Sequence, residues 1–98
     1  ARNHAISDWQ VSRAFSAVGD AAQATAWGLA CLDLVEVHDL GAFLLGSAYE
    51  GLARAAVTGG DTAERDRYLA LADEALAAIS DDEEREVLEA DLSEHRQA

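Results

Sequence analysis

The chain has 98 residues, half of them apolar, which is enough for a single domain with one hydrophobic core. Nineteen acidic residues outnumber seven arginines, lysine is absent, and the net charge of −12 would repel the phosphate backbone of a nucleic acid. No apolar run approaches the roughly 20 residues that cross a bilayer, and no signal-peptide pattern opens the chain. We therefore expect a cytoplasmic protein with neither nucleic-acid nor membrane partners.

The pattern of turns predicts an all-α fold of five helices. Proline is absent, and the glycines lie where the apolar periodicity breaks, so the helices should be joined by very short turns. In the first helix, Ser7 or Asp8 can serve as the N-cap, and Gly19 is placed to close the C-terminal end. The apolar stripe expected to face the core of this helix consists of Val11, Ala14, Phe15 and Val18.

The second helix is expected to begin at Asp20, with Gln23 three residues later completing a capping box. Apolar residues occupy nearly the whole circumference between positions 21 and 37, so this helix is predicted to be the most buried. Cys31 has apolar neighbours and no second cysteine to pair with. This favours an inert core thiol in a reducing compartment over a catalytic nucleophile.

The third helix is expected to begin near Asp39 and to end at Gly59–Gly60. Asp61 then begins the fourth helix, with Glu64 as its capping partner. The apolar stripes are Leu45, Ala48, Tyr49, Leu52 and Ala56 in the third helix, and Tyr68, Leu69, Ala72, Ala75, Leu76 and Ile79 in the fourth. Three glycines recur every five residues and are expected to permit close helix approach: Gly41, Gly46 and Gly51.

The fifth helix, at about 81–96, is preceded by a Ser-Asp-Asp-Glu segment that offers another capping box. Its sizeable apolar residues are Val87, Leu88 and Leu92. One face should therefore dock while the other stays in water, as a capping helix at the end of a stack requires. Asp91 and His95 lie one turn apart and could share a metal ion, but a polar terminal helix favours an ordinary surface pair.

The acidic charge is concentrated towards the C-terminus. Residues 1–60 carry six acids and three arginines, a net charge of −3, whereas residues 61–98 carry thirteen acids and four arginines, a net charge of −9.

One segment of the chain is repeated. Residues 11–20 return 41 residues later as residues 52–61, with Arg, Ala, Gly and Asp kept in register. In each copy an amphipathic helix is expected to end at Gly and the next helix to begin at Asp, which is typical of a helical hairpin. A helix pair that cannot bury its apolar face alone must stack on a neighbour, so the repeat predicts a helical stack.

Small, aromatic and turn positions recur in the two copies: Ser12, Phe15, Gly19–Asp20, Ala24 and Cys31–Leu32 in the first, and Leu52–Ala53, Gly60–Asp61 and Ala75–Leu76 in the second. This pattern resembles the tetratricopeptide-repeat (TPR) family, in a divergent form of bacterial type. The chain departs from the family at Gly28 and at Ala56, which replaces an aromatic residue. The interval of 41 also exceeds the usual ~34 residues.

The resemblance to the TPR family implies a stack of antiparallel helix pairs. The first repeat would span about 8–38, the second about 39–79, and the capping helix about 81–96. It also implies a protein or peptide partner on the face built from the first helix of each repeat, with no catalysis and no cofactor.

A binding groove on that face is one hypothesis. The residues that would line it are Trp9, Arg13, Phe43, Ser47, Glu50 and Arg54. Aromatic and arginine side chains are common at the energetic centres of interfaces, and Arg13 and Arg54 could grip an acidic peptide. Alternatively, Trp9 and Phe43 only cap the core, and Glu50 and Arg54 form an ordinary helical surface pair. The uncapped N-terminal end of a two-repeat stack could also use this surface to form a homodimer.

A homo-oligomerisation domain with no separate ligand is one alternative function, and a metal-dependent enzyme is another. Residues 35–41 resemble the His-Asp signature of the all-α metal-dependent phosphohydrolases, and His4, His38 and Asp39 would be the metal ligands. The candidates for a distant fourth ligand are Asp61, Asp66 and Asp73. Helix capping by Asp39, and a favourable position for His38 at the end of a helix, explain both residues without a metal.

Overall fold

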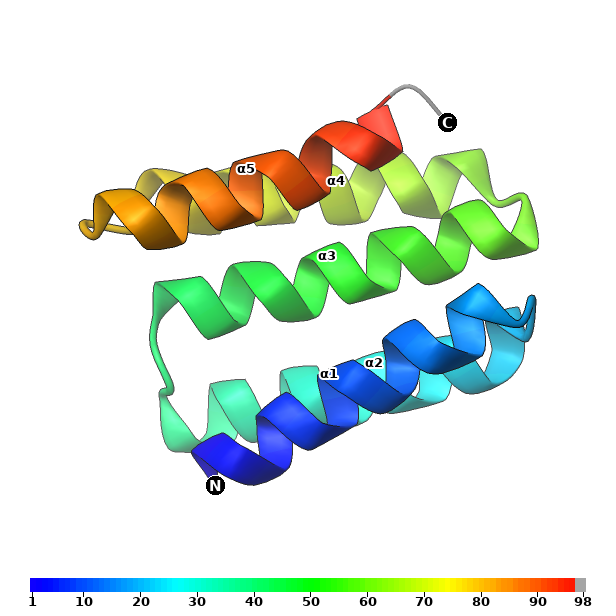
Figure 1. The fold of residues 1–98 in the computed structure, drawn as a ribbon, viewed down its shortest axis with the longest axis horizontal. Coiled ribbons are helices and arrows are strands. Elements are labelled where there is room, and N and C mark those ends of the chain that lie inside the picture. The colour runs from blue at the N-terminus through cyan, green and yellow to red at the C-terminus, as the bar shows by residue number, and fades with distance from the viewer. Residues whose placement is uncertain (97–98) are drawn as a thin grey trace.

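The computed structural model describes residues 1–96, and in this part of the chain it is all-α, as predicted. The five helices are α1 (Arg2–Ala17), α2 (Ala21–His38), α3 (Ala42–Gly59), α4 (Thr62–Ala77) and α5 (Asp82–Arg96). Figure 1 shows α1 and α2 as one antiparallel pair, α3 and α4 as a second pair, and α5 along the second pair. In that view α1, α3 and α5 lie in front, with α2 and α4 behind them.

Helix α3 is the centre of the molecule, because it packs against each of the other four helices. Nine of its residues are buried, against four in α2. The expectation that α2 would be the most buried helix is therefore wrong. Among the described helices, α2 packs against α1 and α3 alone, and its outer side leaves Trp27 and Val37 exposed, at 37% and 69% of their surface.

The first helix differs from the prediction in both its start and its orientation. It begins at Arg2, and Asp8 lies in its interior, so neither Ser7 nor Asp8 is the N-cap. Its buried residues are Ala5, Asp8 and Ser12, whereas Val18 is 77% exposed. Small side chains let α1 approach its neighbours closely, and the Ser12 hydroxyl donates a hydrogen bond of 2.7 Å to the carbonyl of Ala24 on α2. The apolar stripe predicted as core therefore lies on the flank of α1.

Aspartates cap the second, fourth and fifth helices. The Asp20 carboxylate accepts a 3.0 Å hydrogen bond from the Gln23 amide, and Asp61 accepts an identical one from the Glu64 amide, as predicted. The fifth helix uses Asp81, which accepts from the Glu84 amide at 2.9 Å, rather than the expected Ser80 box. These side chains satisfy amides that have no partner within the helix.

The α2–α3 turn departs from the prediction. Asp39 does not begin the third helix; it ends α2 in a left-handed conformation, with φ of 48°. Gly41, with φ of 98°, is the residue that precedes α3. An L side chain is disfavoured at that angle, so Gly41 serves the turn rather than helix packing.

The other two glycines of the five-residue series allow close helix approach, as predicted. A Cβ atom at Gly46 would lie 2.5 Å from Leu88 Cδ2 of α5, and one at Gly51 would lie 3.3 Å from Trp9 Cδ1 of α1. Glycine at these positions lets α1 and α5 both lie against α3.

Candidate functional site

A groove runs along α3 between α1 and α5, and we call it the α1–α5 groove. Both helices pack on α3, but their backbones do not contact each other in the described residues. The groove contains an apolar hollow of about 150 Å³ and a more polar hollow of about 360 Å³. The apolar hollow is lined by Ile6, Trp9, Phe43, Ser47, Val87 and Asp91, among others. The polar hollow is lined by Arg13, Ser16, Arg54, Thr58, Glu94 and His95, among others.

A buried carboxylate lies between the two hollows. Glu50 of α3 has no exposed surface, and three side chains from different helices bind it. Trp9 Nε1 donates to Glu50 Oε1 at 3.3 Å, and Arg54 Nε donates to Glu50 Oε2 at 3.0 Å. His95 Nε2 lies 2.7 Å from the same Oε2 atom. Glu50 therefore connects α1, α3 and α5, and its burial is tolerable because both oxygens are paired.

These partners also determine the acidity of Glu50. Burial, the largest single influence, raises the pKa of the Glu50 carboxyl. The hydrogen bond to His95 and the positive charge of Arg54 together outweigh burial, and the pKa of Glu50 is lowered from its ordinary value. Glu50 is thus a stable carboxylate and is poorly suited to holding a proton for acid catalysis near neutral pH.

A second set of ion pairs crosses the outer part of the groove. Arg13 Nη1 of α1 lies 3.9 Å from Asp91 Oδ2 of α5, and its guanidinium carbon lies 4.9 Å from the centre of the Trp9 ring. Arg54 Nη2 also reaches Glu94 Oε2, at 3.4 Å. Burial and the nearby Glu50 charge raise the pKa of Asp91. Arg13 and Arg54 therefore already have carboxylate partners.

The α5 side of the groove was not expected from the sequence. His95 is buried against Glu50, so the interpretation of Asp91 and His95 as an ordinary surface pair is wrong for His95. A signal for these residues exists: Asp91 and His95 lie 41 residues after Glu50 and Arg54, the same interval that relates Trp9 and Arg13 to them. Extending the repeat by one more interval would have indicated α5 as a third wall.

The structure brings the six predicted groove residues onto adjoining faces of α1 and α3. Trp9, Phe43 and Ser47 line the apolar hollow, and Arg13 and Arg54 line the polar one. Glu50 lies beneath them, out of contact with solvent. The Ser16 hydroxyl beside Arg13 is buried and has no hydrogen-bond partner in the described part of the chain.

The proposed metal ligands are not gathered into a site. His4 Nε2 lies 3.7 Å from Asp8 Oδ1 on the same helix, while His38 and Asp39 form the end of α2. Across residues 1–96, no three His, Cys, Asp or Glu side chains are arranged to hold a metal ion. Arg96 pairs with Asp73, one of the suggested distant ligands, at 2.6 Å.

Cys31 is buried in the core beside Asp8. Burial first, and the Asp8 charge second, raise the pKa of the Cys31 thiol to about 11. The reactive thiolate is therefore scarce at neutral pH.

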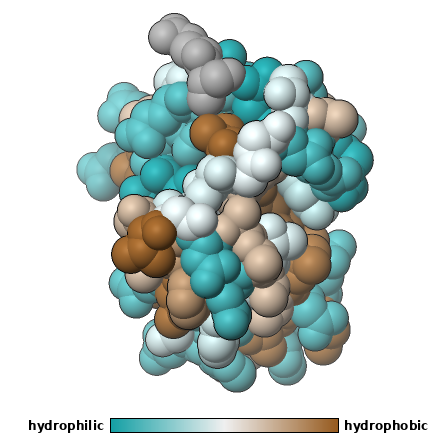
Figure 2. Space-filling model, turned by 90° about the vertical axis from the view of Figure 1, so that its right-hand side faces the viewer, coloured by the Kyte–Doolittle hydropathy of each residue, from teal (hydrophilic) through white to brown (hydrophobic). Residues whose placement is uncertain are grey.

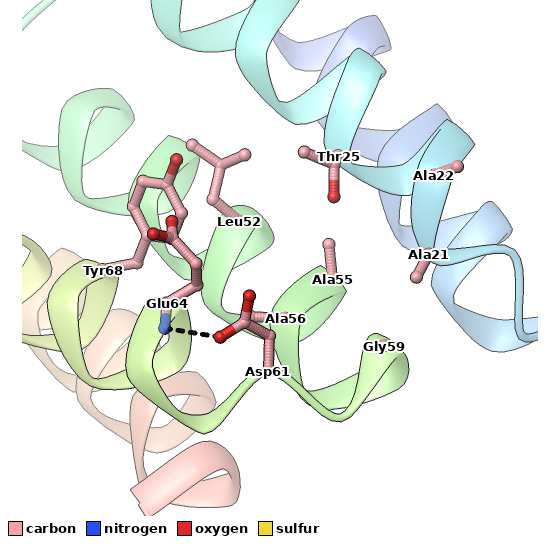
Figure 3. Close-up of a pocket in the computed structure, with 10 residues that line it drawn as sticks. All are labelled: Ala21, Ala22, Thr25, Leu52, Ala55, Ala56, Gly59, Asp61, Glu64 and Tyr68. Atoms are coloured by element: carbon pink, nitrogen blue, oxygen red, sulfur yellow. Dashed lines mark hydrogen bonds between the residues drawn. The ribbon is translucent and has the colours of Figure 1, made fainter.

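A larger hollow, of about 410 Å³, lies on the opposite side of the molecule between α2 and α4 (Figure 3). In Figure 3, Thr25 and Asp61 face each other across a floor that includes Ala55. Its acidic groups already serve the helix: Asp61 caps α4, and Glu64 pairs with Arg67 at 2.8 Å. This hollow also has less apolar surface than the apolar hollow of the α1–α5 groove.

A comparison of the chain with family models, with curated proteins and with solved structures finds no match. Within the described residues, every helix falls short of the combined length and apolarity that spanning a bilayer demands.

Proposed function

We propose that this chain is a non-catalytic, TPR-like interaction module that binds a peptide segment of a protein partner in the α1–α5 groove. The observation that carries the proposal is the apolar hollow between Trp9, Phe43 and Val87, which opens beside the buried Glu50 network. Val87 is 54% exposed, so one wall of this hollow is available to a partner.

The partner's contribution is expected to be one apolar side chain. Aromatic walls around a small hollow are suited to an apolar anchor, and such anchors dominate interface energies. Arg13 and Arg54 are less suited to gripping an acidic peptide than the sequence suggested, because Asp91, Glu50 and Glu94 already pair with them. Specificity would then come mainly from the shape of the hollow.

Selection of binders from a random peptide library tests this function. The selected peptides should share an apolar residue at one position. They should lose about tenfold or more in affinity for Ser47→Trp, in which the indole fills the hollow. The matched control is Ala90→Trp, because Ala90 is exposed on α5 but does not line the hollow.

Both variants should retain the helical circular dichroism of the wild type. Peptides that bind Ser47→Trp as tightly as the wild type would contradict the proposal. A selection that yields no specific peptide would contradict it as well.

A further inference from the structure

The open end of the first helix pair carries an apolar face that the core does not use. On α1, Val11, Phe15 and Val18 recur at helical spacing, yet none of them belongs to either cluster of core residues in the described chain. Val11 lies two residues from Trp9, a rotation of about 200°, so it lies on the side of α1 opposite the groove. This stripe therefore points away from α3.

Helix α2 presents a similar face next to it. Leu32 packs against the core around α3, and Ala30, two residues earlier, lies on the opposite side of the helix. Trp27 and Val37 flank Ala30 on this outer side and remain exposed. Figure 1 shows α1 and α2 at one end of the molecule, with no helix beyond them. We call this surface, made of Val11, Phe15, Val18, Trp27, Ala30 and Val37, the open face.

Charge is nearly absent around the turn that joins the two helices of the open face. The 19 residues from Ala14 to Leu32 include one charged residue, Asp20, which caps α2. The corresponding 19 residues of the second pair, 55–73, include Asp61, Glu64, Arg65, Asp66, Arg67 and Asp73. Apolar residues are accordingly more frequent in the lower half of Figure 2, where the first pair lies, than in the upper half.

The size of the open face is adequate for a small interface. Two helices of 16 and 18 residues, each about 25 Å long and together about 20 Å wide, present roughly 500 Å². Two such faces would bury about 1,000 Å², the lower limit for a specific interface. An association through this surface should therefore be reversible.

We infer that the open face binds the same face of a second copy of this chain, forming a two-fold symmetric dimer. The part of the open face around the α1–α2 turn is nearly uncharged, so it can pair with itself without placing like charges opposite one another. At the far end of α2, the exposed Asp33 lies about one turn from both Ala30 and Val37. The acidic α4 and α5 lie at the other end of the molecule, which measures 27 Å in this direction in Figure 1. That distance exceeds the Debye length of about 8 Å at physiological salt, so the net charge of −9 on residues 61–98 of each copy does not prevent the contact. The dimer leaves the α1–α5 groove of each copy open.

Analytical ultracentrifugation across the micromolar range tests the dimer. The wild type should approach twice the monomer mass as concentration rises, and higher salt should leave association unchanged or strengthen it. Val18→Glu should weaken association by about tenfold or more, because each copy would have to bury an unpaired carboxylate in the apolar contact. Val87→Glu is the matched control, since Val87 is an exposed valine outside the open face, and it should dimerise like the wild type.

Val18 lies at the C-cap of α1, so its substitution should leave the circular dichroism spectrum unchanged. A wild type that stays monomeric throughout would overturn the inference, and so would a Val18→Glu variant that dimerises normally. Loss of the dimer in Val87→Glu would place the contact in the groove and overturn it too. Ser47→Trp should dimerise normally, so failure of the groove proposal and failure of the dimer are distinguishable.

Discussion

The two helix pairs share a sequence repeat but differ in their surroundings. The capping hydrogen bonds of Asp20 and Asp61 have the same length, and both aspartates stand at the same place in their repeat. Yet three residues of α1 are buried, against nine of α3. The difference arises because α3 has helices on both sides, while α1 has neighbours on one side only. Equivalent local signals therefore determine equivalent helices, and the position in the stack determines burial.

Equivalent positions along the groove also carry different chemistry. Trp9, Glu50 and Asp91 follow one another at intervals of 41 residues, on α1, α3 and α5. The central member is the one that is fully buried, and Trp9 donates a hydrogen bond to it. The following experiments compare how much central and peripheral positions of the stack contribute to the free energy of unfolding.

Removal of the central carboxylate should have the largest effect. Glu50→Ala leaves Arg54 and the buried His95 without their shared partner, and we expect a loss of about 3–5 kcal/mol in the free energy of unfolding. Urea denaturation followed by circular dichroism measures it. Glu94→Ala is the control: this carboxylate is exposed, and its loss should change stability by less than about 1 kcal/mol. A Glu50→Ala variant within 1 kcal/mol of the wild type would contradict the central role of α3.

The dependence of protein stability on acid pH should show the contribution of the same carboxylate, Glu50. Because the pKa of Glu50 is lower in the folded protein than in the unfolded chain, its stabilisation is complete above about pH 4.3. The stabilisation is lost as the pH falls through the lower, folded-state value. Glu50→Gln cannot titrate, so the wild type should lose more stability than this variant over that acid range. Parallel pH profiles for the two proteins would refute a lowered pKa.

Glycine substitutions compare the contact between α2 and α3 with the contacts that α3 makes with α4 and α5. Gly46→Ala should destabilise by about 1–2 kcal/mol, because the new methyl group meets Leu88 Cδ2 at 2.5 Å and Ala75 Cβ at 3.4 Å. Gly28→Ala should have a smaller effect, since its new methyl group would lie 2.8 Å from Leu52 Cδ2, which is a less severe overlap than the one at Gly46. Alanine also improves helix propensity by up to about 1 kcal/mol in both variants. Thermal or urea unfolding measures both changes, and the reverse order would contradict the closer approach of the neighbouring helices at Gly46.

The smallest expected effect concerns the helix caps, where the two repeats are most alike. Asp20→Ala and Asp61→Ala each remove one capping hydrogen bond of 3.0 Å and should each cost about 1 kcal/mol. The two losses should agree within about 0.5 kcal/mol, because each cap acts only on its own helix. If the two variants lost unequal amounts of stability, the position of a helix in the stack would influence even the contribution of its N-cap.

Much of the helical layout was predictable, because it depends on neighbours in the sequence. The turns after Gly19 and Gly60, and the caps at Asp20 and Asp61, involve residues three or four positions apart. The rotation of α1 was not predictable in this way. Val11, Phe15 and Val18 form an apolar stripe as clear as a core stripe, but periodicity does not reveal whether another helix covers it.

The candidate site was predictable only in part. The sequence pattern placed Trp9, Arg13 and Arg54 on one surface, but it treated Glu50 as an exposed partner of Arg54. Burial of Glu50 depends on Trp9 and His95, which are 41 and 45 residues away along the chain. No local rule predicts that such distant side chains will pair with a carboxylate.

The sequence by itself determined that the chain forms helices, where Asp20 and Asp61 begin two of them, and that its acidic charge lies towards the C-terminus. Only the tertiary structure decided which helix became central, which carboxylate became buried and which apolar stripe stayed uncovered. The physical reason is the distance along the chain over which each kind of interaction acts. Capping and helical periodicity act within about one turn, whereas burial depends on which helices pack together across the whole fold.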